Sequence, residues 1–398
     1  MKIHNFDEKV DMLAAKSKRY EILERDPEIL PMWIADTDFK VPQEIIDAMV
    51  ERTLQGTFGY PSEVSEYSEA VQHWMATRFD TEVDADEVVF VPGVLPGIVY
   101  LIRAMTNPGD KILINGPAYL QLQEITRNNG RRVELCPLLY MNSHYELDFE
   151  RMEKQLRDER VTMMLLCNPH NPTGRVFTRD ELERIGRMCL ENDVFLVSDE
   201  IHCDMVYPGY KHTPIISLDP EIARNAATFI NPSKSFNIPG LRSGAAIIPD
   251  ANVRKKMNVS IVNNKAYGRN CLGQIAVITA YTQCAYYIDQ EVAYVQENLK
   301  LLTEFLEKNV PEIKVVKPEA MYLIWLDCRS LGLDQDGIDK FFLDECKIKL
   351  NNGGGFGPDG IGFMRMNIAC TRAQVEEACR RMDTAAKALR AKRATEEA

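Results

Sequence analysis

The sequence predicts an α/β protein in which a doubly wound, largely parallel sheet is followed by a smaller α+β domain. Short apolar runs alternate with helical patterns from about residue 88 to residue 250, as in strand–helix–strand units. A long helical pattern at residues 274–310 then separates this part from a second set of strands and helices. We therefore expect a large domain over residues 46–285 and a small domain made of residues 1–45 and 286–398.

The strands of the large sheet are expected at six apolar runs, which are residues 88–91, 111–114, 161–166, 194–197, 227–230 and 245–248. The run at 161–166 is apolar apart from Thr162, which indicates a strand buried on both faces. A helix is expected at residues 43–55, because Pro42 suits the first turn and apolar residues follow at helical spacing. Thr178 and Glu181 form the sequence pattern of a capping box, so a helix should begin there too.

The C-terminal part predicts a smaller α+β unit. The apolar stripe of residues 274–310 indicates one helix that bridges the two domains. Strands are expected at 313–316, 322–326 and 362–367, and helices at 337–346 and 372–391. The glycine-rich segment 351–357 lacks the Gly-Lys-Ser/Thr ending of a nucleotide loop, and we expect a mobile loop there. Residues 387–398 are expected to be frayed.

Composition restricts the classes of function. The formal net charge of −12 over 398 residues disfavours nucleic acid or an anionic membrane as the main partner. No apolar run approaches the ~18 residues of a membrane span, and the polar N-terminus is unlike a signal peptide, which favours a cytoplasmic protein. The 10 cysteines never occur as C-x-x-C or in a short His/Cys cluster, so we expect reduced, mostly buried thiols and no metal site.

Four polar side chains follow strands of the predicted sheet: Tyr119, Asn171, Asp199 and Lys234. Ligands of α/β sheets bind at the carboxyl ends of the strands, so the convergence carries more weight than any one residue. Taken singly, Tyr119 is equally well explained as a half-buried core residue and Asp199 as a helix cap. An acid at the end of a buried strand would need a cation, and a protonated ring nitrogen would serve.

Lys234 and Arg242 lie eight positions apart on one loop. A desolvated lysine can lose its proton and become a nucleophile, whereas arginine stays charged and grips phosphate or carboxylate. This pairing suits a Schiff base between Lys234 and pyridoxal phosphate. For any single Lys/Arg pair, two solvated surface cations are the better explanation, so the other site residues must decide.

Further features fit a phosphate-bearing ligand. The turn at residues 92–97 joins a strand to a helix start, where free backbone N–H groups hold a phosphate. His202 would lie near the same ligand, and no metal-binding spacing surrounds it. Arg365 interrupts an apolar strand, so it lies either at an exposed edge or against an anionic ligand. The sequence of residues 31–39 indicates an ordered loop, and the more specific interpretation is an active-site lid.

Three motifs follow one another in the chain, NPHNPTG, then SDE, then SK with GLRSG after it. In order and spacing they resemble the fold-type I pyridoxal-phosphate enzymes of the class I/II aminotransferase superfamily. The likeness runs over nearly the whole chain and implies the fold of PLP-dependent transferases. Within that superfamily, PMWIADTDF, SDEIHCD and GGGFGPDGIGFMRMNIA are most similar to the MalY/PatB-type carbon–sulfur lyases, the cystathionine β-lyase branch.

The resemblance implies roles for individual residues. Lys234, Asp199 and Tyr119 would be catalytic, with Lys234 binding the cofactor, Asp199 pairing with the pyridine nitrogen and Tyr119 stacking on the ring. The residues expected to contact pyridoxal phosphate are Lys234, Asp199, Asn171, Tyr119, Val94, Leu95, Ser233, Arg242, His202 and Tyr60. Of these, Asn171 would bind the ring hydroxyl, while Ser233, Arg242 and the backbone of Val94 and Leu95 would hold the phosphate.

The substrate side is also implied by the resemblance. Arg365 would bind the α-carboxylate of a small amino acid, with Ala35 and Asn171 beside it. Tyr60 would reach the phosphate of the neighbouring subunit, which makes the active unit a homodimer. Two positions depart from the family pattern: Asn231 stands where relatives often have Ser, and Thr37 where they often have Met.

The implied reaction is β-elimination from L-cystathionine or related cysteine S-conjugates, which gives pyruvate, ammonia and a thiol. An aminotransferase with the same site residues is the alternative. A non-catalytic regulator with the same fold is disfavoured, because no basic helix-turn-helix domain precedes the fold and no catalytic position is lost.

Overall fold

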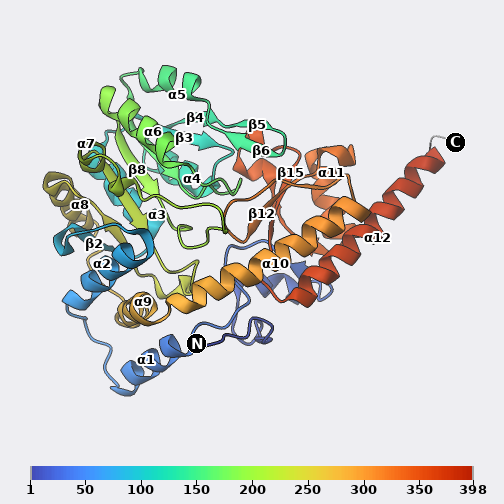
Figure 1. The fold of residues 1–398 in the computed structure, drawn as a ribbon, viewed down its shortest axis with the longest axis horizontal. Helices are drawn as coiled ribbons and strands as arrows, with labels where there is room; N and C mark the ends of the chain where they lie inside the picture. Colours follow the sequence, from blue (N-terminus) through green and yellow to red (C-terminus); the bar gives the residue numbers. More distant parts are fainter. Residues whose placement is uncertain (1, 397–398) are drawn as a thin grey trace.

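The large sheet contains seven strands, and the computed structural model describes residues 2–396 of the chain (Figure 1). In spatial order the strands are β2 (Val88–Val91), β10 (Gly244–Ile247), β9 (Ala226–Ile230), β8 (Phe195–Asp199), β7 (Val161–Cys167), β3 (Lys111–Gly116) and β4 (Arg132–Pro137). All neighbours are parallel except β10, which is antiparallel to both β2 and β9. The predicted α/β class and the largely parallel sheet are confirmed.

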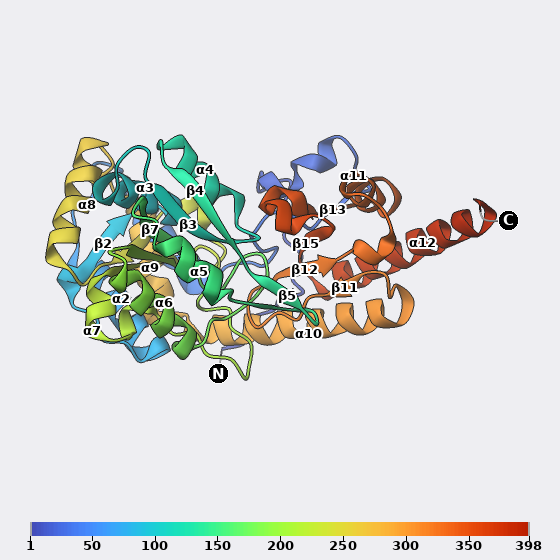
Figure 2. The ribbon, with the colours of Figure 1, turned by 90° about the horizontal axis from the view of Figure 1, so that it is seen from above.

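Helices cover both faces of this sheet (Figures 1 and 2). One apolar layer joins the strands to α3 (Val94–Met105), α4 (Leu120–Asn128) and α8 (Ala251–Asn263). The opposite layer joins them to α5 (Phe149–Leu156), α6 (Arg179–Glu191) and α7 (Pro220–Arg224). Along β7, Met163 and Leu165 enter the first layer and Met164 and Leu166 the second, since successive side chains point to opposite faces. This explains why the strand is apolar except for the half-buried Thr162.

Two helices, α1 (Gln43–Leu54) and α6, begin where the sequence predicts. α1 follows Pro42, and α2 (Ser65–Phe79) packs with α1 against α9 (Cys271–Gln283). At the start of α6 the capping box forms: the hydroxyl of Thr178 accepts from the Glu181 backbone, and Glu181 accepts from the Thr178 backbone at 2.7 Å.

The small sheet is antiparallel, with the order β11 (Lys314–Val315), β12 (Leu323–Asp327), β15 (Phe363–Asn367) and β14 (Asn351–Asn352). It lies beside the paired helices α10 (Ala285–Asn309) and α12 (Arg372–Glu396), and α11 (Gln335–Lys340) runs into a π-helical turn at Phe341–Glu345 (Figure 2). Two further strand pairs are β5 (Leu139–Met141) with β6 (His144–Glu146), and β1 (Leu30–Pro31) with β13 (Ile348–Lys349).

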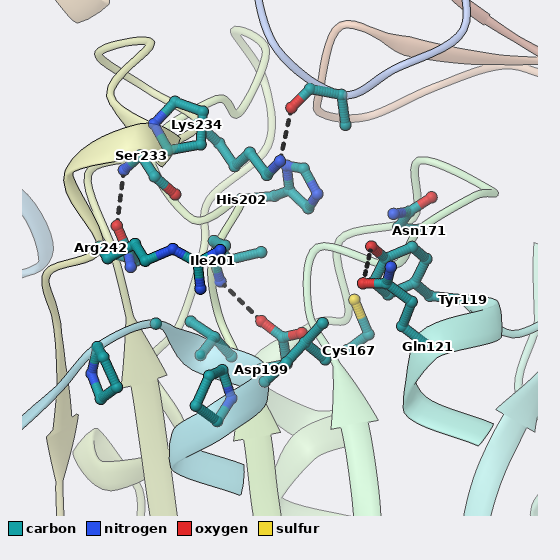
Figure 3. Close-up of a pocket in the computed structure, with 18 residues that line it drawn as sticks. Tyr119, Gln121, Cys167, Asn171, Asp199, Ile201, His202, Ser233, Lys234 and Arg242 are labelled. Carbon is teal, nitrogen blue, oxygen red and sulfur yellow. Dashed lines mark hydrogen bonds between the residues drawn. The ribbon is translucent and has the colours of Figure 1, made fainter. Parts of the chain in front are cut away.

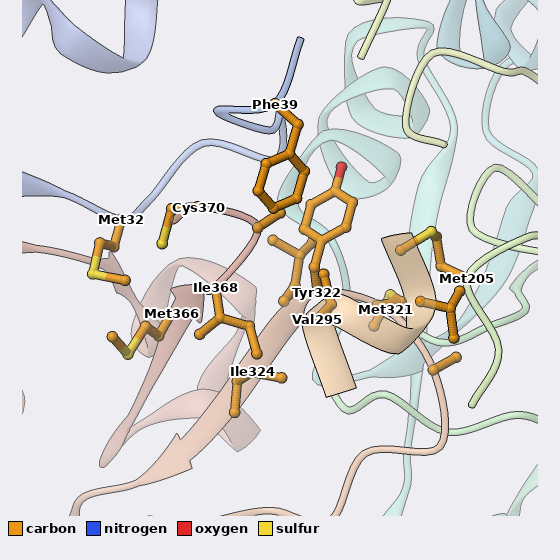
Figure 4. Close-up of a cluster of buried hydrophobic side chains, with 14 of the residues drawn as sticks. Met32, Phe39, Met205, Val295, Met321, Tyr322, Ile324, Met366, Ile368 and Cys370 are labelled. Atoms are coloured by element: carbon orange, nitrogen blue, oxygen red, sulfur yellow. The ribbon is translucent and has the colours of Figure 1, made fainter. Parts of the chain in front are cut away.

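Part of the N-terminal segment packs against the small sheet and the helix α10. Met32 and Phe39 pack in one apolar cluster with Tyr322, which precedes β12, Val295 of α10 and Ile368 (Figure 4). Together with the β1–β13 pairing, this cluster holds residues 31–39 between the two sheets.

Three sequence expectations need correction. Residues 274–310 are not one helix, because the chain leaves helical geometry at the buried Cys284 so that α9 and α10 pack on different partners. Segment 351–357 forms β14 and a 3-10 turn at Gly353–Phe356 instead of a loop without regular structure. Of the residues expected to fray, 387–396 are helical, and 397–398 lie outside the described residues.

Tertiary contacts explain the long C-terminal helix. The guanidinium of Arg390 donates to both carboxylate oxygens of Glu312 at 2.6 Å and to the backbone oxygen of Asn309 at 3.1 Å. These bonds fix the last turns of α12 to the end of α10, and the local sequence gives no sign of them.

Within residues 2–396, no helix is both long enough and apolar enough to cross a membrane. The ten cysteines are all free, and every one except Cys271 is buried.

Candidate active site

A cavity of about 270 Å³ opens at the carboxyl ends of the parallel strands (Figure 3). Its walls come from the turn before α3, from the loops after β3, β7, β8 and β9, and from Ala35 of the N-terminal segment. The cavity brings together all the predicted site residues except Tyr60 and Arg365: Ala35, Val94, Leu95, Tyr119, Asn171, Asp199, His202, Ser233, Lys234 and Arg242.

Lys234 reaches into the cavity from the turn after β9. Its Nζ donates to the backbone oxygen of Ala35 at 2.6 Å, so residues 31–39 form the wall that the amine faces. Burial lowers the pKa of Lys234 to about 8, and the nearby Asp36 carboxylate opposes that shift. Near neutral pH a larger fraction of this amine is therefore uncharged and nucleophilic than in a solvated lysine.

Asp199 stands at the end of β8 and is almost fully buried. One carboxylate oxygen accepts from the backbone N–H of Ile201 at 3.2 Å, and burial raises the pKa of Asp199 to about 7. Among residues 2–396, no Lys, Arg or His side chain forms an ion pair with it. A buried carboxyl without a cationic partner fits the protonated ring nitrogen of pyridoxal phosphate.

The part of the cavity wall formed by the start of α3 and by Ser233 and Arg242 suits an anion. Val94 and Leu95 begin α3, where the first backbone N–H groups have no acceptor within the helix. The Arg242 side chain lies at the exposed rim, and the buried Ser233 contributes its hydroxyl to the wall. Asn231 lines the wall as well, and its side-chain oxygen accepts from the Ser233 backbone at 2.9 Å. This part of the wall has the donors that a phosphate needs.

Arg365 lies behind the cavity wall in β15. Its guanidinium donates to the side-chain oxygen of Asn171 at 3.0 Å, to that of Asn351 at 2.6 Å and to the backbone oxygen of Trp33 at 3.1 Å. Burial lowers the pKa of Arg365 to about 10, which leaves it a cation at neutral pH. The sequence left two places open for Arg365, an exposed sheet edge or a position against an anionic ligand. The exposed edge is excluded, because Arg365 is only 4% exposed.

Tyr119 and His202 are held in neutral forms. The Tyr119 hydroxyl donates to the side-chain oxygen of Gln121 at 2.7 Å, and burial raises the pKa of Tyr119 to about 12. Burial lowers the pKa of His202 to about 3, so its ring is uncharged at neutral pH. Both rings are therefore available for contact with a flat ligand without adding charge to the cavity.

Several residues of the cavity wall were not predicted from the sequence. The cavity is also lined by Gln121, Cys167, Ile201 and Pro239. Cys167 pairs with Asp199 across the β7–β8 ladder, so strand register places the thiol beside the carboxyl. Their positions in the sequence could have identified these residues, because each lies within two positions of a predicted site residue or motif.

Tyr60 lies outside the cavity. It is in the loop between α1 and α2, and its side chain is fully exposed. Its predicted contact with a neighbouring subunit therefore stays a prediction.

Within the described part of the chain, no three His, Cys, Asp or Glu side chains are grouped so that they could hold a metal ion.

Comparison with known proteins agrees with this geometry. A family model described as aminotransferase class I and II matches residues 29–382. Cystathionine beta-lyase PatB of Bacillus subtilis is 38% identical and covers 96% of this chain and 99% of its own. Cystalysin from Treponema denticola, whose crystal structure contains pyridoxal 5'-phosphate, matches with a TM-score of 0.94 and 32% identity over 98% of this chain and 100% of that chain.

A PLP-bound C-S lyase from Staphylococcus hominis matches with a TM-score of 0.90 and 30% identity, over 96% of this chain and 98% of that chain. The similarity thus extends over both sheets and the segment between them.

Proposed function

Because the chain belongs to the aminotransferase class I and II family, we propose that it is a pyridoxal-phosphate-dependent carbon–sulfur β-lyase. Its substrate is L-cystathionine or a related cysteine S-conjugate, and the products are pyruvate, ammonia and a thiol. The observation that carries the proposal is the cavity that brings together the Lys234 amine, the Asp199 carboxyl, the start of α3 and Arg242. The full-length similarity to proteins named as cystathionine β-lyase and C-S lyase supports the lyase assignment.

Different residues of the cavity would hold different parts of the cofactor. Lys234 would bind it through its amine, and Asp199 would pair with the ring nitrogen. Asn171 would bind the ring hydroxyl, Tyr119 would stack on the ring, and His202 would lie near it. Val94, Leu95, Ser233 and Arg242 would hold the phosphate. Pyridoxal phosphate, when bound, supplies an electron-accepting ring next to the substrate Cα.

The chemical step uses the low pKa of Lys234. Once the substrate amino group has taken its place at the cofactor, the freed Lys234 amine would act as general base and remove the Cα proton, and the electron pair released there would expel the thiolate from the β-carbon. Arg365 binds the α-carboxylate, with Asn171 and Ala35 beside it, so that the Cα–H bond is held near Nζ. Water then converts the remaining fragment to pyruvate and ammonia.

The active unit is a homodimer in which Tyr60 reaches the phosphate of the neighbouring subunit. Three side chains support this arrangement: Leu54, Phe58 and Tyr60 are 81%, 59% and 102% exposed and lie close together in the sequence at the end of α1 and the loop after it. Exposed apolar side chains gathered in this way are typical of an interface. We place the enzyme in the cytoplasm, where its ten free cysteines would stay reduced.

The test is an assay of the purified protein with pyridoxal phosphate and L-cystathionine, without any keto acid. Sustained release of pyruvate and thiol in equal amounts over many turnovers is expected. A single turnover that resumes only when a keto acid is added would identify an aminotransferase and overturn the lyase assignment. Lys234→Ala serves as the control and should lose turnover by several orders of magnitude, because it removes the general base.

A further inference from the structure

The glycine-rich segment 351–357 has no role in the proposed chemistry, yet it contacts Arg365 directly. In the small sheet, β14 pairs with β15 so that Asn351 stands opposite Arg365. The side-chain oxygen of Asn351 accepts from Nη2 of Arg365 at 2.6 Å, the shortest of the three acceptor contacts of that guanidinium. The segment therefore supports the guanidinium from within the same sheet.

Phe356 supports the same guanidinium from another side. The central carbon of the Arg365 guanidinium lies 5.1 Å from the centroid of the Phe356 ring, within the range of a cation–π contact. Phe356 is itself buried and packs edge-on against Trp325 of β12 with 5.2 Å between ring centroids. Its ring is thus held in place by the small sheet.

Glycines allow the segment to pack this closely. A Cβ added to Gly353 would lie 2.2 Å from the backbone oxygen of Gly360, and one added to Gly360 would lie 2.1 Å from that of Gly353. The backbone oxygen of Phe356 also accepts from the backbone N–H of Ala118 at 2.8 Å, next to Tyr119 in the cavity wall. The segment therefore joins the loop that carries Tyr119 to the strand that carries Arg365.

The acceptors around Arg365 are all uncharged. They are the amide oxygens of Asn171 and Asn351 and the backbone oxygen of Trp33, and within residues 2–396 no carboxylate forms an ion pair with Arg365. Such acceptors fix the direction of a guanidinium without neutralising its charge. The protein therefore leaves the charge of Arg365 without a counterion among the side chains that the structure describes.

We propose that Asn351 and Phe356 are positioning residues that orient Arg365 for the substrate α-carboxylate, and that a neutral side chain at 351 keeps the Arg365 charge available. This inference rests on the proposed function, in which Arg365 binds that carboxylate. Asn351 and Phe356 act through Arg365 and touch no reacting atom.

The test measures kcat and KM for L-cystathionine and the inhibition constant Ki of propionate, a carboxylate without an amino group, on the cofactor-loaded enzyme. Asn351→Ala should raise KM and Ki about tenfold with little change in kcat, because a hydrogen bond to a charged group is lost. Asn351→Asp should raise both more than Asn351→Ala does, because its carboxylate competes for the guanidinium. Phe356→Leu should raise Ki by a smaller factor.

Asn352→Ala is the matched control. Asn352 lies in the same strand, and its side chain accepts from the Gly354 backbone at 2.9 Å instead of contacting Arg365. It should leave Ki unchanged. If Asn351→Ala and Asn352→Ala change Ki equally, or if Asn351→Ala lowers kcat with KM and Ki unaltered, the positioning role is wrong.

Arg365→Ala separates this inference from the proposed function. An unchanged propionate Ki in Arg365→Ala would show that the carboxylate assignment itself is wrong. A raised Ki in Arg365→Ala together with a parental Ki in both Asn351 variants would overturn only the positioning role. Should Asn351→Asp fail to fold, Asn351→Ala and Phe356→Leu carry the same comparison.

Discussion

At the scale of single residues, burial sets the protonation states of the cavity. Desolvation disfavours charge, so it lowers the pKa of Lys234 to about 8 and raises that of Asp199 to about 7. The same cause makes His202 a neutral ring with a pKa of about 3. A cavity that removes these groups from water thus prepares a nucleophilic amine and a carboxyl that is stabilised by a cationic ligand.

The raised pKa of Asp199 predicts a pH-dependent stability. The folded protein without cofactor binds the carboxyl proton more tightly than the unfolded chain does, so stability is lost as the pH rises from about 4 through about 7. Asp199→Asn should therefore raise the free energy of unfolding of the cofactor-free protein at pH 8 by on the order of 4 kcal/mol, and by much less at pH 5. Thermal unfolding at both pH values measures the difference.

Asp158→Asn is the control, and it should change the free energy of unfolding at pH 8 in the direction opposite to Asp199→Asn. Hydrogen bonds from Arg160 and Lys111 hold the pKa of the Asp158 carboxyl below its usual range, so its contribution to stability is present at pH 8 and is lost on acidification. That variant should be less stable than the parent at pH 8. An equal gain for Asp199→Asn at pH 5 and pH 8 would contradict a raised pKa.

At the scale of elements, close backbone contacts decide where the chain can turn. The 3-10 turn at Gly353–Phe356 packs on the start of β15, where a Cβ on Gly353 would lie 2.3 Å from the backbone oxygen of Phe363. Gly355, in the same turn, has no other atom within 4 Å of its Cβ position. There is therefore room for a side chain at position 355 and none at position 353, although the two glycines are only two positions apart.

This difference predicts the outcome of two substitutions. Gly353→Ala should destabilise the protein by about 3 kcal/mol or more, because backbone atoms at such distances must move apart. Gly355→Ala should be close to neutral. The midpoint of thermal unfolding, measured side by side, checks both, and equal midpoints for the two variants would show that the segment is looser than its packing indicates.

At the scale of the whole molecule, the cavity lies where both sheets and the N-terminal segment meet. The large sheet contributes Asp199 and the Lys234 loop, Ala35 of the N-terminal segment lines the wall, and Arg365 of the small sheet lies behind the wall, bonded to Asn171. The domain limits at residues 46–285 stay a prediction. So does the second subunit, which the exposed side chains of Leu54, Phe58 and Tyr60 favour.

A shared active site predicts complementation between two defective variants. Lys234→Ala and Tyr60→Ala proteins should each have little activity, and in a mixed dimer one of the two sites carries neither substitution. Random exchange of subunits in an equal mixture should therefore restore about a quarter of the parental activity. An activity of the mixture no higher than that of its components would show that Tyr60 does not serve the neighbouring subunit.

The sequence alone determined the family, the largely parallel sheet and the loops of the cavity, because strand patterns are local and ligands of such sheets gather at one edge. Lys234, Asp199, Asn171 and Tyr119 were predicted in this way, and the cavity brings them together. Only the tertiary structure decided the break at Cys284 and the helical end of α12, because these depend on partners far along the chain. The same is true of the Asn351–Arg365 contact, which exists only because β14 and β15 pair in that register.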